Sequence, residues 1–367
     1  MKKGLVLSIM LVLMLVLTAC GQTPQEKFAD TYSKALDVPD QYTQKMSFKI
    51  DNLESDDIYG SEASTIEMLK KMQLDATTSI DKKAEKSYVA FNLSSDGALN
   101  FDLEVDVLMN DKTGEAYIPL DTIVNPDDNL KTLLDQQTGG VFSKINQTYP
   151  DLKNKYISTS ELSETLGETG DKTTKSSESV TKAMEDLQKK LNKIITDYLN
   201  GMDENRFTED DNGNITTTLT KKDFVNLMKD FEKALGEDSV KKDVKAIAES
   251  QGSVTDFDEE YEDFRLDLAD TIKDMQKEKN IKVSLKMSMK PGKDDKFESM
   301  TMKINAEDTE SNTKLGGTFK IENVAFKKIP AFPKDDEIVS TDELQKIIQT
   351  VMIQSMYGDK DLSDSNF

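Results

Sequence analysis

The amino-acid sequence predicts an α+β protein built on a large, curved antiparallel β-sheet, with amphipathic helices packed on one face. Three observations predict this fold class. Apolar and polar residues alternate with a period of two in many segments, turn-forming residues separate these segments, and other segments carry apolar residues at intervals of three and four. The alternation is typical of strands with one buried and one solvated face, as in antiparallel sheets. The wider spacing is typical of helices that bury one side.

The chain opens with the features of a secretory signal. Lys2 and Lys3 precede an apolar run, residues 5–17. At about 13 residues, this run is shorter than the roughly 20 residues that cross a bilayer as a helix. The next segment, Leu17-Thr18-Ala19-Cys20-Gly21, resembles the lipobox of bacterial lipoproteins, in which an aliphatic residue and two small residues precede a cysteine.

The lipobox resemblance implies cleavage between Ala19 and Cys20 and attachment of diacylglycerol to the Cys20 thiol. Residues 1–19 would then be a signal peptide, and residues 20–27 a lipidated tether. The sequence contains no second long apolar stretch. We therefore expect the lipid to be the membrane anchor and the protein to lie on the extracytoplasmic face of the cell membrane.

Residues 28–157 are predicted to form a first half, made of a helix and antiparallel strands. In its clearest strand, residues 99–107, Leu, Phe and Val alternate with Asn, Asp and Glu. Turn sequences such as Ser95-Asp96-Gly97 separate the strands. Together, the strands and turns of the whole chain predict hairpins around residues 71–93, 87–108, 101–119, 204–219 and 281–305.

Residues 180–360 are predicted to form a second half. It follows a segment rich in Ser, Thr and Glu, residues 158–179, which we predict to be a flexible loop. Residues 361–367 would be a C-terminal tail. The two halves are either separate domains or parts of one continuous curved sheet. We favour one continuous unit slightly, because neither half alone has many strands.

Four apolar stripes predict amphipathic helices, and docking on the sheet is the favoured use of each. The stripe in residues 257–275, for example, includes Phe257, Tyr261, Phe264 and Ile272. The last helix is expected to begin near Ser340, whose side chain is suited to an N-cap. The four stripes span residues 180–198, 224–235, 257–275 and 344–352.

Composition excludes several classes of function. The net charge of −22 argues against binding to nucleic acid, which requires a basic surface. The chain has no histidine, and its single cysteine is the predicted lipid attachment site. Histidine-dependent catalysis and Cys- or His-ligated metals are therefore excluded. Arg206 and Arg265 are the only arginines, so bidentate sites for phosphate or carboxylate are scarce.

Two short motifs are better explained as turns than as chemical sites. A calcium loop with Gly213 at its sixth position would have Thr208 first and Leu219 last, where acidic ligands are needed, so a hairpin turn is favoured. Fragments beginning at Ser79, Ser95 and Lys112 resemble the serine β-lactamase and penicillin-binding motifs in order, but they lie too close together for that fold. We predict no catalytic residues, no metal and no cofactor.

Methionine is the best clue to a ligand. Methionine side chains are flexible and suit surfaces that accommodate varied apolar partners. A curved sheet lined with them could enclose an acyl chain, although filling of an irregular core is the simpler explanation. The candidate ligand-binding residues lie on the apolar faces of predicted strands and are Met46, Phe48, Met72, Met287, Met289, Met300 and Met302.

The order of signal, lipobox, helix, hairpins and further helices is similar to that of Gram-positive surface lipoproteins. More remotely, it resembles the half-barrel carriers of the LolA/LppX type, which hold lipid between a curved sheet and its helices. This resemblance implies a half-barrel-like sheet and a non-enzymatic lipoprotein that binds or shuttles a hydrophobic ligand such as lipid. The alternative is an interaction or scaffold protein that contacts other proteins of the cell envelope and has no small-molecule ligand.

Overall fold

The computed structural model describes residues 22–56, 61–97, 100–159, 178–250, 256–293 and 296–357. Ala19, Cys20 and the whole predicted signal peptide lie outside these ranges, as do the predicted tail and most of the predicted loop 158–179. The first described helix, α2, begins at Pro24, inside the segment 20–27 that we predict as a tether.

The structure confirms the predicted fold class. Eleven strands of the described ranges form one open, curved antiparallel sheet. The strands are β1 (Gln41–Glu54), β2 (Met72–Asp81), β3 (Lys86–Asp96), β4 (Asn100–Asn110), β5 (Glu115–Pro119), β6 (Tyr156–Ser158), β7 (Thr208–Glu209), β8 (Ile215–Thr220), β9 (Ile281–Pro291), β10 (Phe297–Asp308) and β11 (Thr313–Val324).

The first and last strands meet in the middle of the sheet. Its strand order is β6-β5-β4-β3-β2-β1-β11-β10-β9-β8-β7. β1 pairs with β11, with Met46 opposite Ile321, so strands before and after residues 158–179 belong to one ladder. All five predicted hairpins are confirmed, as β2–β3, β3–β4, β4–β5, β7–β8 and β9–β10.

Helices occupy the remaining described segments, and Ser340 caps the last of them as predicted, accepting a hydrogen bond from Glu343 N at 3.2 Å. The α-helices are α2 (Pro24–Ser33), α3 (Ser61–Leu69), α4 (Leu120–Val124), α5 (Asp128–Thr138), α6 (Val141–Thr148), α8 (Glu178–Asn200), α9 (Lys221–Leu235), α10 (Asp238–Ser250), α11 (Phe257–Lys277) and α12 (Thr341–Tyr357). Short 3₁₀ helices are η1 (Lys34–Leu36), η2 (Pro150–Asn154), η3 (Glu204–Arg206) and η5 (Asp335–Glu337).

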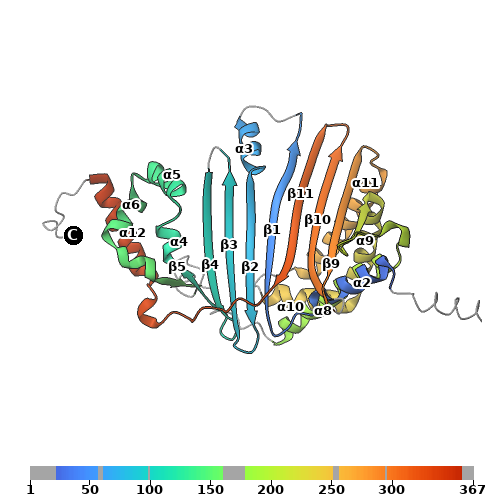
Figure 1. Ribbon diagram of the computed structural model, residues 1–367, viewed down its shortest axis with the longest axis horizontal. Coiled ribbons are helices and arrows are strands. Elements are labelled where there is room, and N and C mark those ends of the chain that lie inside the picture. Colours follow the sequence, from blue (N-terminus) through green and yellow to red (C-terminus); the bar gives the residue numbers. More distant parts are fainter. Residues whose placement is uncertain are drawn as a thin grey trace, which may run out of the picture.

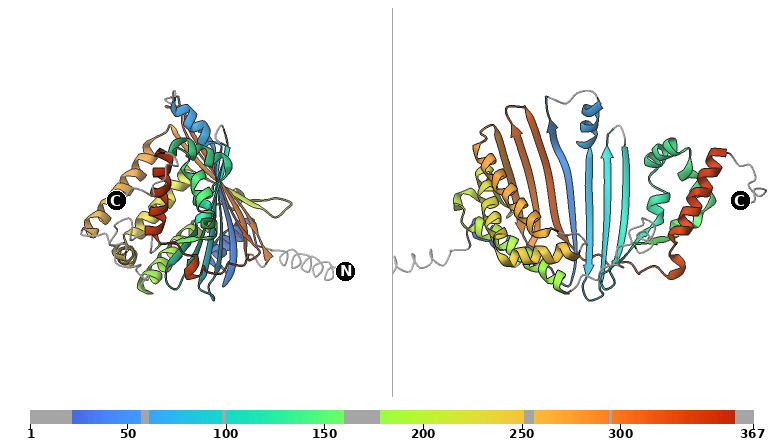
Figure 2. Two further views of the ribbon diagram at one scale, coloured as in Figure 1. Left: turned by 90° about the vertical axis from the view of Figure 1, so that its left-hand side faces the viewer. Right: turned by 180° about the vertical axis from the view of Figure 1, so that it is seen from behind.

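Apart from α3, which lies at the ends of β1 and β2, the described α-helices stand in two groups at opposite ends of the sheet. Figure 1 shows α4, α5, α6 and α12 at one end, and α2, α8, α9, α10 and α11 at the other. In the edge-on view of Figure 2 both groups lie on the same side of the sheet. Between the two groups, no described helix crosses the central part of the middle strands (Figure 2).

Each group of helices makes its own core with the sheet. At one end, Phe28 of α2 and Leu199 of α8 are fully buried against Met287 and Met289 of β9. At the other end, residues of α4, α6 and α12 surround Ile157 of β6. The C-terminal helix α12 therefore packs on elements of the first half of the chain.

One helix departs from the sequence-based expectation. The stripe in residues 257–275 predicts docking on the sheet, but α11 packs against α9 in a second layer. Phe257, Tyr261 and Ile272 are buried there, whereas Phe264 is 56% exposed. The second layer offers one neighbouring helix rather than a broad sheet, so it covers only part of the predicted stripe.

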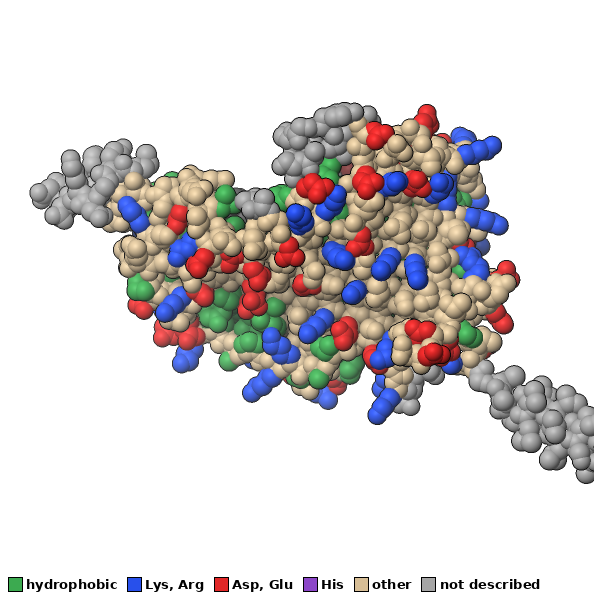
Figure 3. Space-filling model, turned by 45° about the horizontal axis from the view of Figure 1, so that its top comes forward, with side chains coloured by type: hydrophobic (Ala, Val, Ile, Leu, Met, Phe, Trp, Pro, Cys, Tyr) green, Lys and Arg blue, Asp and Glu red, His purple; other side chains and the backbone are tan. Residues whose placement is uncertain are grey.

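The opposite face of the sheet, which we call the outer face, is mostly polar. Residues 325–334, which we call the strap, cross it on the way from β11 to α12 (Figure 1). Ile329 of the strap is buried against Tyr88 of β3 and Leu108 of β4. In Figure 3, lysine and acidic side chains are spread over the outer face, and hydrophobic side chains gather toward its lower left.

Candidate functional site

Large apolar side chains are exposed on the middle strands of the sheet. Phe48, Leu74 and Phe91 are each 42% exposed, Ile304 is 39% exposed and Leu315 is 45% exposed. They lie on β1, β2, β3, β10 and β11, five adjacent strands. At about 4.8 Å between strands, this set spans about 19 Å across the sheet.

Strand register places all five side chains on one face. Phe48 is opposite Leu74 on one side and Phe319 on the other, and Phe319 is opposite Met302. Residues directly opposite each other share a face, and so do residues two apart on one strand. Ile304 therefore lies on the same face as Phe48, and the same steps place Phe91 and Leu315 there.

The helices pack on this same face. Met302 is opposite Met287, which is buried beneath α2 and α8. At the other end, Ile118 of β5 packs against the α4–α6–α12 core. It shares a face with Phe91, because Ala116 is opposite Met109 and Phe91 is opposite Val105, four residues from Met109 on β4. We call the exposed middle stretch between the two helical groups the open face. Contiguous exposed apolar surface of this kind is typical of sites that bind apolar partners.

The seven predicted ligand-binding residues share this face but fall into two groups. Met287, Met289 and Met300 are only 4%, 0% and 6% exposed, because helices at that end of the sheet cover them. The remaining four lie on or beside the open face: Phe48 is exposed, and Met46, Met72 and Met302 are half-buried.

A cavity adjoins one end of the open face. It has a volume of about 730 Å³ and lies between α2, η1, α8 and the sheet; we call it the α2–α8 pocket. Met300 and Ile321 form part of its floor. Ile321 is opposite Met46, which is two residues from Phe48, so the sheet wall of the pocket continues directly into the open face.

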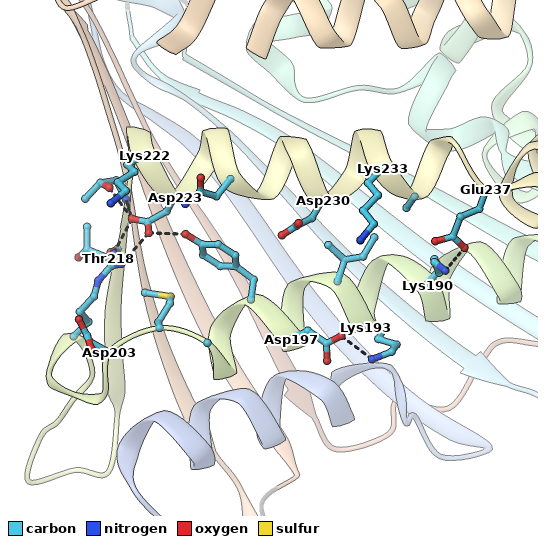
Figure 4. Close-up of a pocket in the computed structure, with 18 residues that line it drawn as sticks. Lys190, Lys193, Asp197, Asp203, Thr218, Lys222, Asp223, Asp230, Lys233 and Glu237 are labelled. Atoms are coloured by element: carbon cyan, nitrogen blue, oxygen red, sulfur yellow. Dashed lines mark hydrogen bonds and ion pairs between the residues drawn. The ribbon is translucent and has the colours of Figure 1, made fainter. Parts of the chain in front are cut away.

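A larger cavity, of about 900 Å³, lies between α8 and α9 and is mainly charged. Figure 4 shows that α8 and α9 run side by side along it, with Asp230 and Lys233 projecting from α9. Two ion pairs cross or flank it, Lys190–Glu237 and Lys193–Asp197. We call it the α8–α9 pocket.

The buried carboxylate of Asp223 fixes one end of the α8–α9 pocket. Arg206 donates to both carboxylate oxygens, at 2.8 and 2.7 Å, and the Tyr198 hydroxyl donates to Oδ1 at 2.7 Å. The backbone N–H and the hydroxyl of Thr220 both donate to Oδ2 at 2.6 Å. The network ties β8 and α9 to α8 and leaves the carboxylate fully engaged.

These contacts shift two pKa values in opposite directions. Burial alone would raise the pKa of Asp223, but the hydrogen bonds from Arg206, Thr220 and Tyr198 outweigh burial and hold it well below its ordinary value. Burial, followed by the hydrogen bond to Asp223, raises the pKa of Tyr198 to about 12. A carboxylate that stays ionised and accepts five hydrogen bonds is suited to holding structure rather than to proton transfer.

The turn explanation fits the calcium-like motif, whereas Ser79 and Ser95 of the other motif lie within β2 and β3. Gly213, at φ +77°, lies in the tight β7–β8 turn, where Asp210 accepts hydrogen bonds from the backbone of Asn212 and Asn214. Ser79 is buried and shares a hydrogen bond with Thr43. Within the described ranges, no three or more His, Cys, Asp or Glu side chains are grouped so that they could hold a metal ion.

Two parts of the site were not predicted from the sequence: the Asp223 network and the exposure of the open face. The Asp223 network has a sequence signal: Thr220 and Asp223 match a capping box before an apolar stripe, and Arg206 is one of two arginines. Alternation does place Leu74 and Phe91 on the apolar faces of their predicted strands, as it does Met46 and Met72. It does not show that these faces are left uncovered, because coverage depends on where distant helices pack.

Comparison with models of known protein families, with curated proteins and with solved structures finds no match. No helix within the described ranges has the length and apolar character needed to cross a membrane. The function must therefore be inferred from the chemistry of the site itself.

Proposed function

We propose that this protein is a lipid-anchored, non-enzymatic protein of the extracytoplasmic membrane face that binds or carries a hydrophobic ligand such as a lipid. The observation that carries the proposal is the open face, where five large apolar side chains on adjacent strands are each 39–45% exposed. Burial of these side chains against acyl chains would be favourable, at about 0.8 kcal/mol for each CH₂ group removed from water.

The arrangement of the open face suits an extended apolar ligand. The surface is bounded by helices at both ends of a curved sheet, so a ligand lying across the strands would be held on more than one side (Figure 2). The two helical cores hold these ends in place without contribution from the middle strands' exposed side chains. The half-barrel carriers that the sequence resembles hold lipid between the same kinds of elements.

The start of the described chain suits a membrane anchor at Cys20. Phe28 of α2 is fully buried, and the Gln25 side chain donates to Leu199 O at 2.9 Å at the end of α8. The folded core thus begins only a few residues after the predicted lipid site. Lipid on Cys20 would hold the open face close to a membrane that could supply its ligand.

Native mass spectrometry of the chain without its first twenty residues, which precede all described elements, tests the proposal. After incubation with vesicles of phosphatidylglycerol and diacylglycerol, we expect masses of protein with bound lipid. Phe48→Asp places a charge in the open face and should reduce lipid binding about tenfold or more. Leu74→Asp should act in the same way and provides a second, independent variant.

Phe264→Asp is the matched control, because Phe264 is also exposed but lies on α11, away from the open face. Its lipid binding should equal that of the unsubstituted protein. Circular dichroism would establish that each variant folds. Lipid-free protein under all conditions, or equal losses in the open-face and control variants, would contradict the proposal.

A second candidate function is protein–protein interaction, as the sequence alternative suggests. Apolar side chains are also exposed outside the open face: Leu266 of α11 is 64% exposed, and Met352 of α12 is 47% exposed. Single exposed apolar residues are common on protein surfaces, however. The contiguous open face therefore favours the lipid proposal.

A further inference from the structure

Strands β1 and β11 change from apolar to polar where the open face runs into the α2–α8 pocket, while Phe297 and Met300 of β10 keep its floor apolar. Along β1, Phe48 and Met46 are followed on the same face by Gln44 and Tyr42. The neighbouring strand changes at the same level, because Ile321 is opposite Met46 and Asn323 is opposite Gln44. Gln44 donates to Asn323 at 3.1 Å. A ligand lying along the strands would therefore meet an apolar surface and then a hydrogen-bonding surface.

Two tyrosine hydroxyls in the α2–α8 pocket are available to a ligand. Tyr32, from α2, and Tyr42, from β1, both line the pocket, and neither hydroxyl has a hydrogen-bond partner among the described residues. Burial raises the pKa of both side chains, with a further contribution from Asp111 at Tyr42. Both hydroxyls thus remain protonated at neutral pH and can donate as well as accept.

The charges around the α2–α8 pocket balance. Its charged lining residues are Lys82, Lys189, Asp37 and Glu185. Lys189 already pairs with Glu185 at 3.7 Å. Neither arginine of the chain lines the pocket, so the bidentate donors that favour phosphate are missing from this lining. A chain with a net charge of −22 adds a further electrostatic cost to binding an anion.

We infer that the α2–α8 pocket is the subsite for the polar end of the ligand, and that this end is uncharged and rich in hydroxyl or carbonyl oxygen, as in a diacylglycerol. The inference rests on the proposed function, because the acyl chains of the same ligand lie on the open face. Tyr32 and Tyr42 bind the glycerol end, and Met300 and Ile321 form the apolar floor at the junction.

Competition between two lipids with identical chains tests the subsite. The protein is incubated with vesicles holding equal amounts of dioleoylglycerol and dioleoylphosphatidylglycerol, and bound lipid is identified by native mass spectrometry. We expect dioleoylglycerol to exceed dioleoylphosphatidylglycerol by about tenfold. Tyr42→Phe should weaken dioleoylglycerol binding about fivefold, the effect of losing one hydrogen bond.

Tyr149→Phe is the matched control, because Tyr149 packs beside the core at the far end of the sheet. It should leave the preference unchanged. Equal binding of the two lipids, with no effect of Tyr42→Phe, would overturn the subsite while leaving the lipid-carrier function intact. Absence of both lipids from the protein would instead contradict the proposed function, and the subsite with it.

Discussion

At the scale of single residues, Asp223 is the one charged side chain among the buried polar residues of the described ranges. Its side chain is 6% exposed, and Arg206, which pairs with it, is 30% exposed. An ionised group at such a site is tolerated because five donated hydrogen bonds replace its hydration. Removing the carboxylate would leave those donors facing a site with too few acceptors.

Asp223→Asn should therefore lower the free energy of unfolding by about 2–3 kcal/mol, because an amide offers one acceptor oxygen and turns its NH₂ group toward other donors. A urea titration followed by circular dichroism measures the change. Asp230→Asn, on the same helix but exposed, should change the free energy by less than about 0.5 kcal/mol. Similar midpoints for the two variants would show that the network contributes little.

The pH dependence of stability follows from the same carboxylate. Its pKa in the folded protein lies below its ordinary value of about 3.9, so its contribution is fully present above that value and is lost as the pH falls further. The difference in unfolding free energy between the parent protein and Asp223→Asn should accordingly be constant from pH 5 to 7 and shrink below about pH 4. A difference that persists unchanged to pH 2 would contradict this assignment.

Residue-scale features were only partly predictable. The lack of histidine by itself excludes much chemistry, and alternation assigns Phe48 and Met302 to an apolar face. The exposure of these side chains could not be predicted in the same way. Met287 and Met302 are opposite each other on adjacent strands, yet only Met287 is buried beneath helices. Which of two equivalent methionines is covered depends on the packing of α2 and α8, elements far away in sequence.

At the scale of elements, the strap links the middle of the sheet to α12. Ile329 is 8% exposed against Tyr88 and Leu108, and Lys327 lies 5.4 Å from the centre of the Tyr88 ring. No helix or strand lies within residues 325–334. Side-chain packing and the hydrogen bond from Lys327 N to Thr43 Oγ1, at 2.7 Å, therefore hold the strap in position in place of strand pairing.

Ile329→Ala should therefore lower the free energy of unfolding by about 2–4 kcal/mol, because it leaves a cavity between the strap and the sheet. The midpoint of urea unfolding measures this loss. Ile123→Ala, on α4 with its side chain 46% exposed, is the matched control and should have a much smaller effect. Equal midpoints for the two variants would show that the strap contributes little to stability.

Strands were easier to predict than helix contacts, for a physical reason. The alternation in residues 281–289 follows from one buried and one solvated face, whichever strands lie beside it. The stripe of α11 predicts a helix equally well, but its partner proved to be α9 rather than the sheet. A periodic stripe records that one side is buried and carries no information about the surface that buries it.

At the scale of the whole molecule, the open face results from the way the two helical groups are separated. Each group completes its own core at one end of an eleven-stranded sheet, and the described helices leave the central part of the middle strands uncovered. Local sequence patterns predict the strands and their hairpins. They do not predict that β1 and β11 join the two halves, because that pairing depends on segments at opposite ends of the chain.

The pairing of β1 with β11 has a consequence for the order of folding. Lys327 N donates to Thr43 Oγ1 across 284 positions, so the middle of the sheet cannot close until nearly the whole chain has been synthesised. Contacts so distant in sequence slow folding, and an unpaired strand edge invites association with other chains. If the chain is exported N-terminus first, β1 emerges before β11, and its edge stays unpaired until β11 follows. Successful folding of the protein would then depend on rapid completion of translocation or on a chaperone that covers the unpaired edge of β1.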